Sequence, residues 1–143
     1  MLLGEFKHTI DTKGRLAIPA KFRDVLKSGA IITRGLDRSL FILGMSEWEA
    51  LAKKLTALPL AQGSSRAFAR LMLAGASDVS LDTQGRVLVP DYLREYAGIK
   101  KDVVVTGLMN RIEVWDAETW RAYKAKTEST SDEIAEQLGA LGI

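Results

Sequence analysis

The sequence predicts an α+β fold: a small β-barrel with a pseudo-two-fold axis, built from two ββαββα repeats and flanked by helices. Three observations predict it. A nine-residue stretch, DTKGRLAIP at residues 11–19, returns as DTQGRVLVP at residues 82–90. Apolar side chains near these stretches recur at every second residue, as in half-buried strands. Turn and helix-end residues then follow at matching places in both copies.

The repeat extends well beyond those nine residues. A shift of 71 residues aligns identical residues of the two copies: Gly4, Asp11, Gly14, Arg15, Pro19 and Arg23 with Gly75, Asp82, Gly85, Arg86, Pro90 and Arg94. We therefore expect repeat 1 at 5–47, a helical linker at 48–75, repeat 2 at 76–119 and a helical tail at 120–143. Because two short hairpins rarely bury enough apolar area alone, the repeats should complete one another in a shared barrel.

Each repeat begins with a predicted local hairpin. In the first copy, alternation across residues 5–10 resumes at 16–18, and turn-forming residues lie between. Gly14 and Gly85 suit a backbone that needs a positive φ angle. The carboxylates of Asp11 and Asp82 can accept hydrogen bonds from the amides of their own turns.

A short helix and a second hairpin follow in each repeat. Pro19 and Pro90 suit the first helical turn, and Gly29 and Gly98 suit the helix end. The second hairpins are predicted at 30–33 with 40–43, and at 102–106 with 112–115.

Helices are expected to close both repeats and to form the linker and the tail. Ser46 with Glu49 reads as a capping box for the first closing helix, and Asp116 can cap the second. In the linker, residues 66–73 are amphipathic. Thr130 and Glu133 read as a further capping box in the tail.

Composition excludes several classes of protein. The chain has 143 residues, 47% hydrophobic and 27% charged, without the apolar run that a membrane-spanning helix requires. It has no cysteine and one histidine, His8, which excludes disulfides, thiolate sites and a histidine-rich metal site. The N-terminal residues lack the features of a secretory signal. We expect a cytoplasmic protein without a cofactor and without a membrane partner.

Charge is distributed unevenly between the repeats. Residues 5–47 contain eight Lys/Arg and five Asp/Glu, whereas residues 76–118 contain five and eight. Where the first copy has Lys7 and Lys13, the second has Asp78 and Gln84. The first copy is therefore expected to be the stronger anion contact.

The repeated aspartate and arginine have two interpretations. In one, Asp11 with Arg15 and Asp82 with Arg86 are ion pairs that only hold their turns. In the other, each carboxylate orients a guanidinium whose remaining donors face outward to phosphate or to the O6/N7 edge of guanine.

An enzymatic reading can be compared with these two. Paired Asp-Thr loops in a pseudo-symmetric β-barrel also occur in aspartic proteases, where two carboxylates share one proton. Here an arginine follows each glycine, and a nearby cation lowers the pKa of a carboxyl group and keeps it ionised. We therefore expect no enzyme.

The residues resemble the bacterial MraZ family, whose members carry tandem SpoVT/AbrB-like units. The resemblance is carried by GEFKHTIDTKGRLAIPAKFR, by GLDRSLFIL with SEWEAL, and by DTQGRVLVPDYLREYAGI. It implies a swapped-hairpin AbrB-like barrel and a ring-shaped homo-oligomer. It also implies a nucleoid-associated transcription factor that binds short direct repeats of double-stranded DNA in the promoter of the division and cell wall gene cluster.

The resemblance also implies site residues. Arg15 is the expected DNA contact, joined by Arg86, and the positive charge of the first copy adds Lys13 and Lys7. Asp11, Asp82, Gly14 and Gly85 would support them. Because AbrB-like units also occur in antitoxins, a protein-interaction module remains the alternative.

Overall fold

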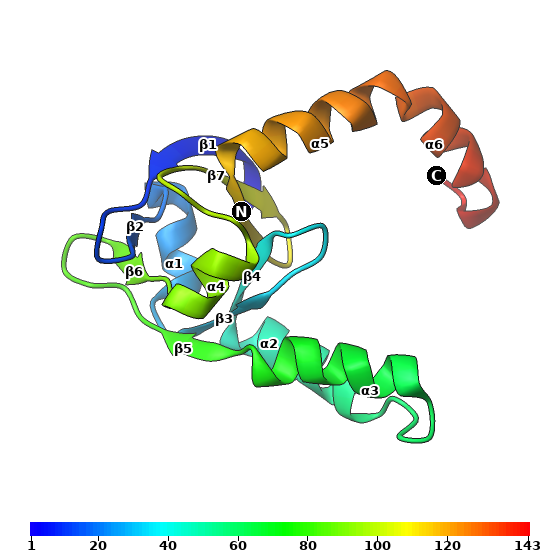
Figure 1. The fold of residues 1–143 in the computed structure, drawn as a ribbon, viewed down its shortest axis with the longest axis horizontal. Helices are drawn as coiled ribbons and strands as arrows, with labels where there is room; N and C mark the ends of the chain where they lie inside the picture. The colour runs from blue at the N-terminus through cyan, green and yellow to red at the C-terminus, as the bar shows by residue number, and fades with distance from the viewer.

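The computed structural model describes residues 1–143 and shows an α+β fold (Figure 1). Its strands, in chain order, are β1 (Leu3–Thr9), β2 (Arg15–Ala17), β3 (Ala30–Arg34), β4 (Leu40–Gly44), β5 (Ser77–Val79), β6 (Arg86–Leu88), β7 (Asp102–Leu108) and β8 (Ile112–Asp116).

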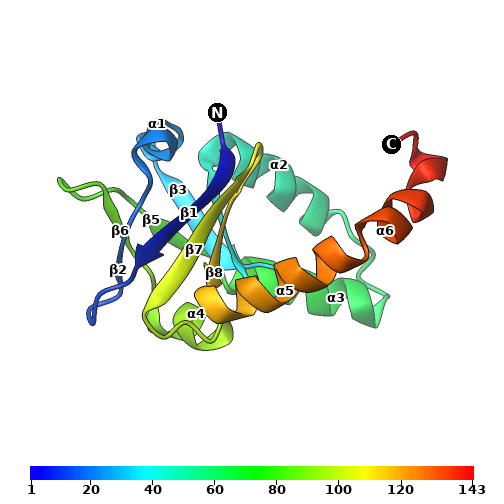
Figure 2. The same ribbon diagram turned by 90° about the horizontal axis from the view of Figure 1, so that it is seen from above.

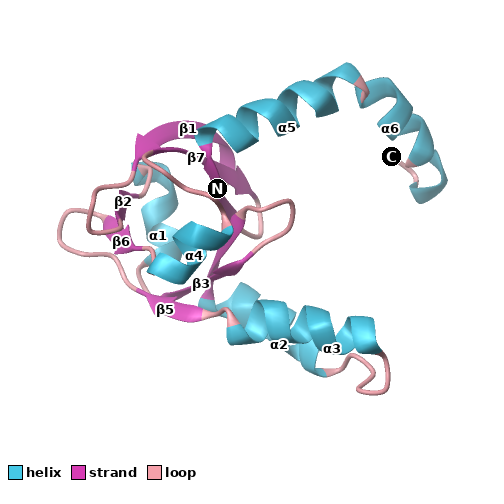
Figure 3. Cartoon of the chain, viewed as in Figure 1, coloured by secondary structure: helices cyan, strands magenta, loops and turns pink.

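Helices surround the strands and extend from them. They are α1 (Arg23–Leu26), α2 (Met45–Thr56), α3 (Gly63–Ala69), α4 (Asp91–Tyr96), α5 (Ala117–Ser129) and α6 (Ser131–Gln137), with short 3-10 or π segments η1 (Ala20–Phe22), η2 (Arg70–Ala74) and η3 (Gly139–Leu141). Figure 3 shows α2 with α3, and α5 with α6, as two arms that leave the strand-rich body. No helix combines the length and apolar character that crossing a bilayer requires.

The strands form two antiparallel sheets. The larger has the order β1-β7-β8-β4-β3-β5, and the smaller is the pair β2-β6. The edge strands β1 and β5 do not pair with each other, so the larger sheet is open. Four pairings join a strand before residue 72 to one after it: β1–β7, β4–β8 and β3–β5 in the larger sheet, and β2–β6, which forms the smaller one. The two halves are therefore interlocked.

The prediction that each repeat begins with a local hairpin is wrong, because the two strands of that hairpin pair with other strands. Strand β1 pairs with β7 over its whole length, and β2 pairs with β6. Between the two arms of the predicted hairpin only one bridge forms, from Ile10 to Leu16. Alternation in sequence reports which face of a strand is buried, but it does not identify the neighbouring strand.

The second hairpin of each repeat forms as predicted. Strands β3 and β4 pair from Ala30 with Gly44 to Arg34 with Leu40, and β7 pairs with β8 in the same way. In the β3–β4 turn, Asp37 has a φ of 59° and Arg38 a φ of 66°. Consecutive positive φ angles fit the right-handed twist of a hairpin.

One hydrophobic core serves both halves. Its fully buried members come from strands of both sheets, from the short helices and from the segments that follow β2 and β6: Leu16, Ile18, Phe22, Ile32, Leu40, Ile42, Val89, Leu93, Val105, Ile112 and Val114. Since neither half contains a core of its own, the small β2–β6 sheet is held in place by side chains from the whole chain.

Two of the predicted helix caps need correction. Helix α2 begins at Met45 with Gly44 as its N-cap, so the Ser46–Glu49 capping box is wrong. Thr130 does precede α6, but its side chain makes no capping hydrogen bond. The prediction for α5 is confirmed, because the Asp116 carboxylate accepts from the Thr119 amide at 3.4 Å.

Candidate nucleic-acid interface

The turn between residues 11 and 15 is organised by one carboxylate. Asp11 Oδ1 accepts from the backbone amides of Lys13 and Arg15, both at 2.9 Å. Asp11 Oδ2 accepts from Arg15 Nε at 2.6 Å. Gly14 has a φ of 85°, which lets the chain reverse direction here without the steric cost of a Cβ atom.

The turn of the second copy repeats this geometry. Asp82 Oδ1 accepts from the amides of Gln84 at 2.8 Å and Arg86 at 2.9 Å, and Asp82 Oδ2 accepts from Arg86 Nε at 2.8 Å. Gly85 has a φ of 75°. We call the two segments 11–15 and 82–86 the first and second Asp/Arg turns. The predicted ion pairs are present in both, while their role in binding stays a prediction.

Both carboxyl groups are held in the ionised form. The pKa of Asp11 is lowered mainly by the hydrogen bond from the Arg15 amide, and further by the Arg15 guanidinium and the Lys13 amide, although partial burial acts in the opposite direction. The same causes, in the same order, lower the pKa of Asp82. Two ionised carboxylates, each with its own arginine, do not form a dyad that shares one proton.

The β2–β6 sheet brings the two arginines onto one face. Its register pairs Arg15 with Leu88 and Ala17 with Arg86. Residues directly opposite each other, and residues two apart on one strand, point to the same side of a sheet. Arg15 and Arg86 therefore lie on one face as diagonal neighbours, with their backbones about 7–8 Å apart across the two strands. The opposite face carries Leu16 and Val87, which are fully buried.

The terminal nitrogens of both arginines are free. Arg15 and Arg86 use Nε for the aspartate and make no hydrogen bond through Nη1 or Nη2. Their side chains are 38% and 26% exposed. Each guanidinium therefore keeps donors for a second acceptor group, and Arg can donate two parallel hydrogen bonds to phosphate or guanine.

Each Asp/Arg turn is also hydrogen-bonded to the opposite repeat. The Ile18 amide donates to the Gly85 carbonyl at 3.0 Å, and the Val89 amide donates to the Gly14 carbonyl at 2.8 Å. Each glycine of one copy thus anchors the strand end of the other copy. This cross-bonding fixes the distance between the two turns.

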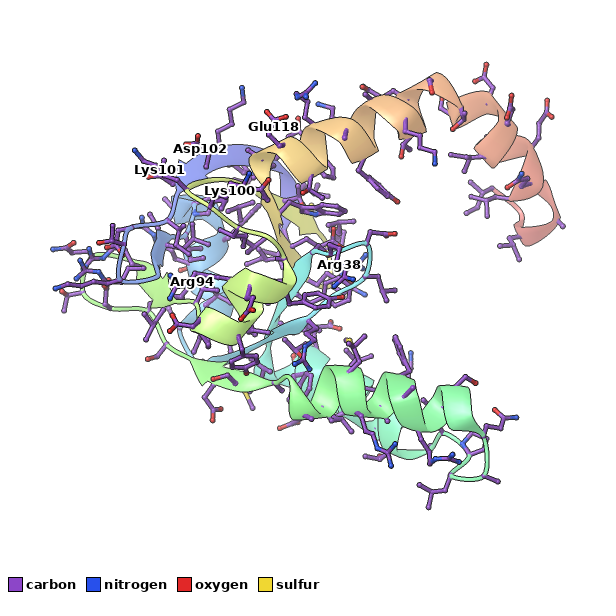
Figure 4. The ribbon with its side chains drawn as sticks, in the orientation of Figure 1. Arg38, Arg94, Lys100, Lys101, Asp102 and Glu118 are labelled. Carbon is purple, nitrogen blue, oxygen red and sulfur yellow. The ribbon has the colours of Figure 1, made fainter.

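Sequence reasoning missed the roles of Arg23 and Arg94. Arg23 Nε donates to the Ile18 carbonyl at 2.9 Å, and Arg94 Nε donates to the Val89 carbonyl at 3.2 Å. Each guanidinium lies against the glycine of the opposite turn, Arg23 against Gly85 and Arg94 against Gly14. The signal was present, because these two arginines align in the repeat. Arg94 is labelled in Figure 4.

The remaining predicted residues divide between two places. Lys13 is exposed on the first turn, beside Arg15. Lys7 lies instead on β1, where it lines a groove of about 920 Å³ between β1, β7 and α5. The structure thus places Lys13 with the arginines and Lys7 apart from them. No group of three or more His, Asp or Glu side chains is positioned to hold a metal ion.

Figures 1 and 2 show the arrangement that results. The β2 and β6 loops project from one end of the body, on the side opposite the two helical arms. This end presents two matched turns, each with a guanidinium group whose Nη atoms are free. An anionic ligand with regularly spaced acceptors fits such a surface.

Comparison with known proteins gives the family. The family model described as "MraZ protein, putative antitoxin-like" matches the chain twice, at residues 1–71 and 72–140. This chain belongs to the MraZ family. The resemblance drawn from the repeated motifs is thereby confirmed.

Similar MraZ proteins extend over essentially the whole chain. The chain is 46% identical to the transcriptional regulator MraZ of Caldanaerobacter subterraneus over 143 residues, the full length of both. It is 50% identical to that of Symbiobacterium thermophilum over 137 residues, which are 96% of this chain and 99% of the relative. The MraZ of Natranaerobius thermophilus is 46% identical over 138 residues, 96% of each chain.

Proposed function

We propose that this protein is a transcriptional regulator that binds double-stranded DNA through the two Asp/Arg turns. One observation carries the proposal: the chain builds the same turn twice, on one face, with a guanidinium held at Nε and free at both Nη atoms. The relatives in the MraZ family carry the name transcriptional regulator.

The proposed target is a set of short direct repeats in the promoter of the division and cell wall gene cluster, as the family resemblance implies. Arg15 and Arg86 would read or clamp the duplex, Lys13 would contact phosphate, and Asp11, Asp82, Gly14 and Gly85 would hold the turns. Lys7 would contribute only to the wider positive field. The protein would act in the cytoplasm, at the nucleoid.

We also propose a ring-shaped homo-oligomer. The formal net charge of one chain is only +2, so a single copy offers few phosphate contacts. Several linked copies on successive repeats raise the affinity through effective concentration. Leu36, Leu108 and Met109 are exposed in or beside the turns of the β3–β4 and β7–β8 hairpins, at the end of the body opposite the Asp/Arg turns (Figure 1). A second copy could cover them.

The strand pairing supports an AbrB-like interpretation of the fold. Strands β2 and β6 come from different repeats and pair with each other. We interpret this exchange, with the cross-bonds of Gly14 and Gly85, as the swapped-hairpin arrangement of an AbrB-like barrel.

Arginine substitutions test the proposal. Arg15→Ala or Arg86→Ala should weaken binding to a promoter duplex by about 1–3 kcal/mol, roughly tenfold to a hundredfold, because a bidentate contact is lost. Fluorescence anisotropy titrations measure the change. Arg70→Ala is the matched control, because Arg70 is exposed on η2 in the α2–α3 arm.

The same titrations examine the alternative function. The family description contains the word antitoxin-like, and for this reason a protein-interaction module is the second candidate function. Salt-independent or absent DNA binding by the correctly assembled wild-type chain, together with a stoichiometric protein partner, would favour that module and defeat the DNA proposal.

A further inference from the structure

A segment of the second repeat lies beside the first Asp/Arg turn. The β1–β7 pairing ends with Thr9 opposite Asp102. One residue further on, the Ile10 amide donates to the Lys101 carbonyl at 2.9 Å. Residues 97–101 join α4 to β7, and the end of this segment therefore runs next to the turn that begins at Asp11. Figures 1 and 2 show the two loops together.

This segment carries two positive charges outside any ion pair, and that of Lys100 also contributes, after the hydrogen bond and charge of Arg121, to the lowered pKa of Glu118 at the start of α5. Lys100 and Lys101 are both exposed, and neither forms an ion pair. Figure 4 labels both side chains, at the end of the body where β1 finishes. Asp102 is exposed too, which leaves a surplus of one positive charge over residues 100–102. With Lys13 on the turn itself, three ammonium groups are available on this side.

The corresponding place beside the second turn is different. There β5 pairs with β3, and Val79 lies opposite Ala30. Residues 27–29, just before β3, therefore correspond to residues 100–102, of which Asp102 lies opposite Thr9 beside the first turn. Lys27 in this segment is ion-paired with Asp24 at 2.7 Å, and Ser28 and Gly29 carry no charge. Gln84 replaces Lys13 on the turn. The second side therefore offers no unpaired lysine.

We propose that Lys100 and Lys101 act with Lys13 as a phosphate-binding extension of the first Asp/Arg turn, so that the DNA-binding end of each chain has one strongly charged and one weakly charged side. The inference rests on the proposed function and adds residues to it. It agrees with the expectation that the first turn is the stronger anion contact, but two of the contacting residues come from the acidic second repeat.

The chemistry favours phosphate over base edges as the target of these lysines. An ammonium group on a flexible stem acts as a point charge, whereas the two arginines have the planar donors that base recognition uses. Phosphate contacts fix the position of a protein on the duplex and are independent of base sequence.

A pair of matched double variants tests the inference in the full-length chain. Lys100→Ala/Lys101→Ala removes the proposed contact. Lys53→Ala/Lys54→Ala removes another exposed adjacent pair, from α2 and away from the turns, and changes the net charge by the same amount. Binding is measured by anisotropy at several salt concentrations, on a promoter duplex and on a scrambled duplex of equal length.

The expected result is specific to the first variant. Its log–log salt dependence should become shallower by about two for each chain that contacts the duplex, one for each lysine, and its affinity at 0.1 M salt should fall by roughly tenfold or more. The loss should be equal on the promoter and the scrambled duplex. The Lys53/Lys54 variant should bind as the wild type does.

Other outcomes are readily distinguished. An unchanged salt slope for Lys100→Ala/Lys101→Ala, or an equal loss for both double variants, would overturn the inference while the DNA-binding proposal stands. A loss confined to the promoter duplex would overturn the assignment to phosphate. Failure of the wild-type chain to bind either duplex would instead defeat the proposed function. Size-exclusion chromatography and circular dichroism confirm that each variant is assembled and folded.

Discussion

At the scale of single residues, the aspartate of each Asp/Arg turn determines the local structure. One carboxylate accepts from two backbone amides and one guanidinium within five residues of chain. These bonds satisfy donors that a tight turn would otherwise leave to water, and they limit the rotamers of the arginine. The arginine is thus oriented before any ligand arrives, which reduces the entropy lost on binding.

The ionised state of these carboxylates makes a prediction about pH. Their pKa values in the folded chain are lower than the ordinary value of 3.8. Their contribution to stability is therefore fully present above that value and is lost as the pH falls through the lowered pKa. Urea unfolding of the wild type and of Asp11→Asn/Asp82→Asn should show a difference in free energy that is constant from pH 7 to 5 and shrinks below about pH 4. A difference that persists unchanged at pH 3 would contradict this.

A second prediction at this scale concerns the glycines of the turns. A Cβ atom at Gly85 would lie 2.4 Å from Arg23 Cζ, and the φ of 75° disfavours any residue with a side chain. Gly85→Ala should therefore destabilise the fold by about 1–2 kcal/mol or more, measured as a lower melting temperature. Gly139→Ala is the control, because nothing lies within 4 Å of its added methyl group. Equal melting temperatures for both variants would refute the steric argument.

At the scale of elements, the β2–β6 sheet depends on its buried face. Each strand is three residues long, and an isolated pair of this size is not stable in water. Leu16 and Val87, on its inner face, pack into the shared core, and the outer face carries the two arginines. The position of the candidate site is therefore supported by core packing.

Two leucines of this sheet provide a matched test. Leu16 is 0% exposed and Leu88 is 58% exposed, on opposite faces. Leu16→Ala should cost about 2–5 kcal/mol of unfolding free energy because it leaves a cavity, while Leu88→Ala should stay within about 0.5 kcal/mol. Chemical denaturation measures both. If the two variants were equally stable, the inner face would not hold the sheet in place.

At the scale of the whole molecule, the two repeats are one folding unit. Six of the eight strands belong to one hydrogen-bonded sheet, and the other two, β2 and β6, pair with each other. Four strand pairings cross between the halves. Only the β3–β4 and β7–β8 hairpins are contained within one half. Repetition in the sequence therefore does not mean independent domains here.

Separated halves should consequently fail to fold. Residues 1–71 and 72–143, produced as two polypeptides, each lose the partners of their crossing strands and should show circular dichroism of unfolded chains. When mixed, they should recover strand and helix signal, because the crossing pairs can form again. A cooperative thermal transition in either half alone would show that the repeats are independent.

Much of the fold could be predicted from the sequence, because its signals are local. The second hairpins, the short helices after Pro19 and Pro90 and the Asp116 cap follow from residues within a few positions of one another. The partners of β1 and β2 could not be predicted in the same way. A strand of alternating pattern can pair with any strand that buries the same face, and the choice depends on residues some 70 to 100 positions away.

The same distinction between local and long-range interactions applies to the candidate site. Each turn, with its positive φ glycine and its carboxylate accepting from the arginine, was determined by five consecutive residues, since the hydrogen bonds of its aspartate are all local. Only the tertiary structure decided that the two arginines share a face, that Arg23 and Arg94 pack against the opposite turns, and that Lys101 lies beside Ile10. Those relations arise from pairing between the halves, which is set by the burial of one common core.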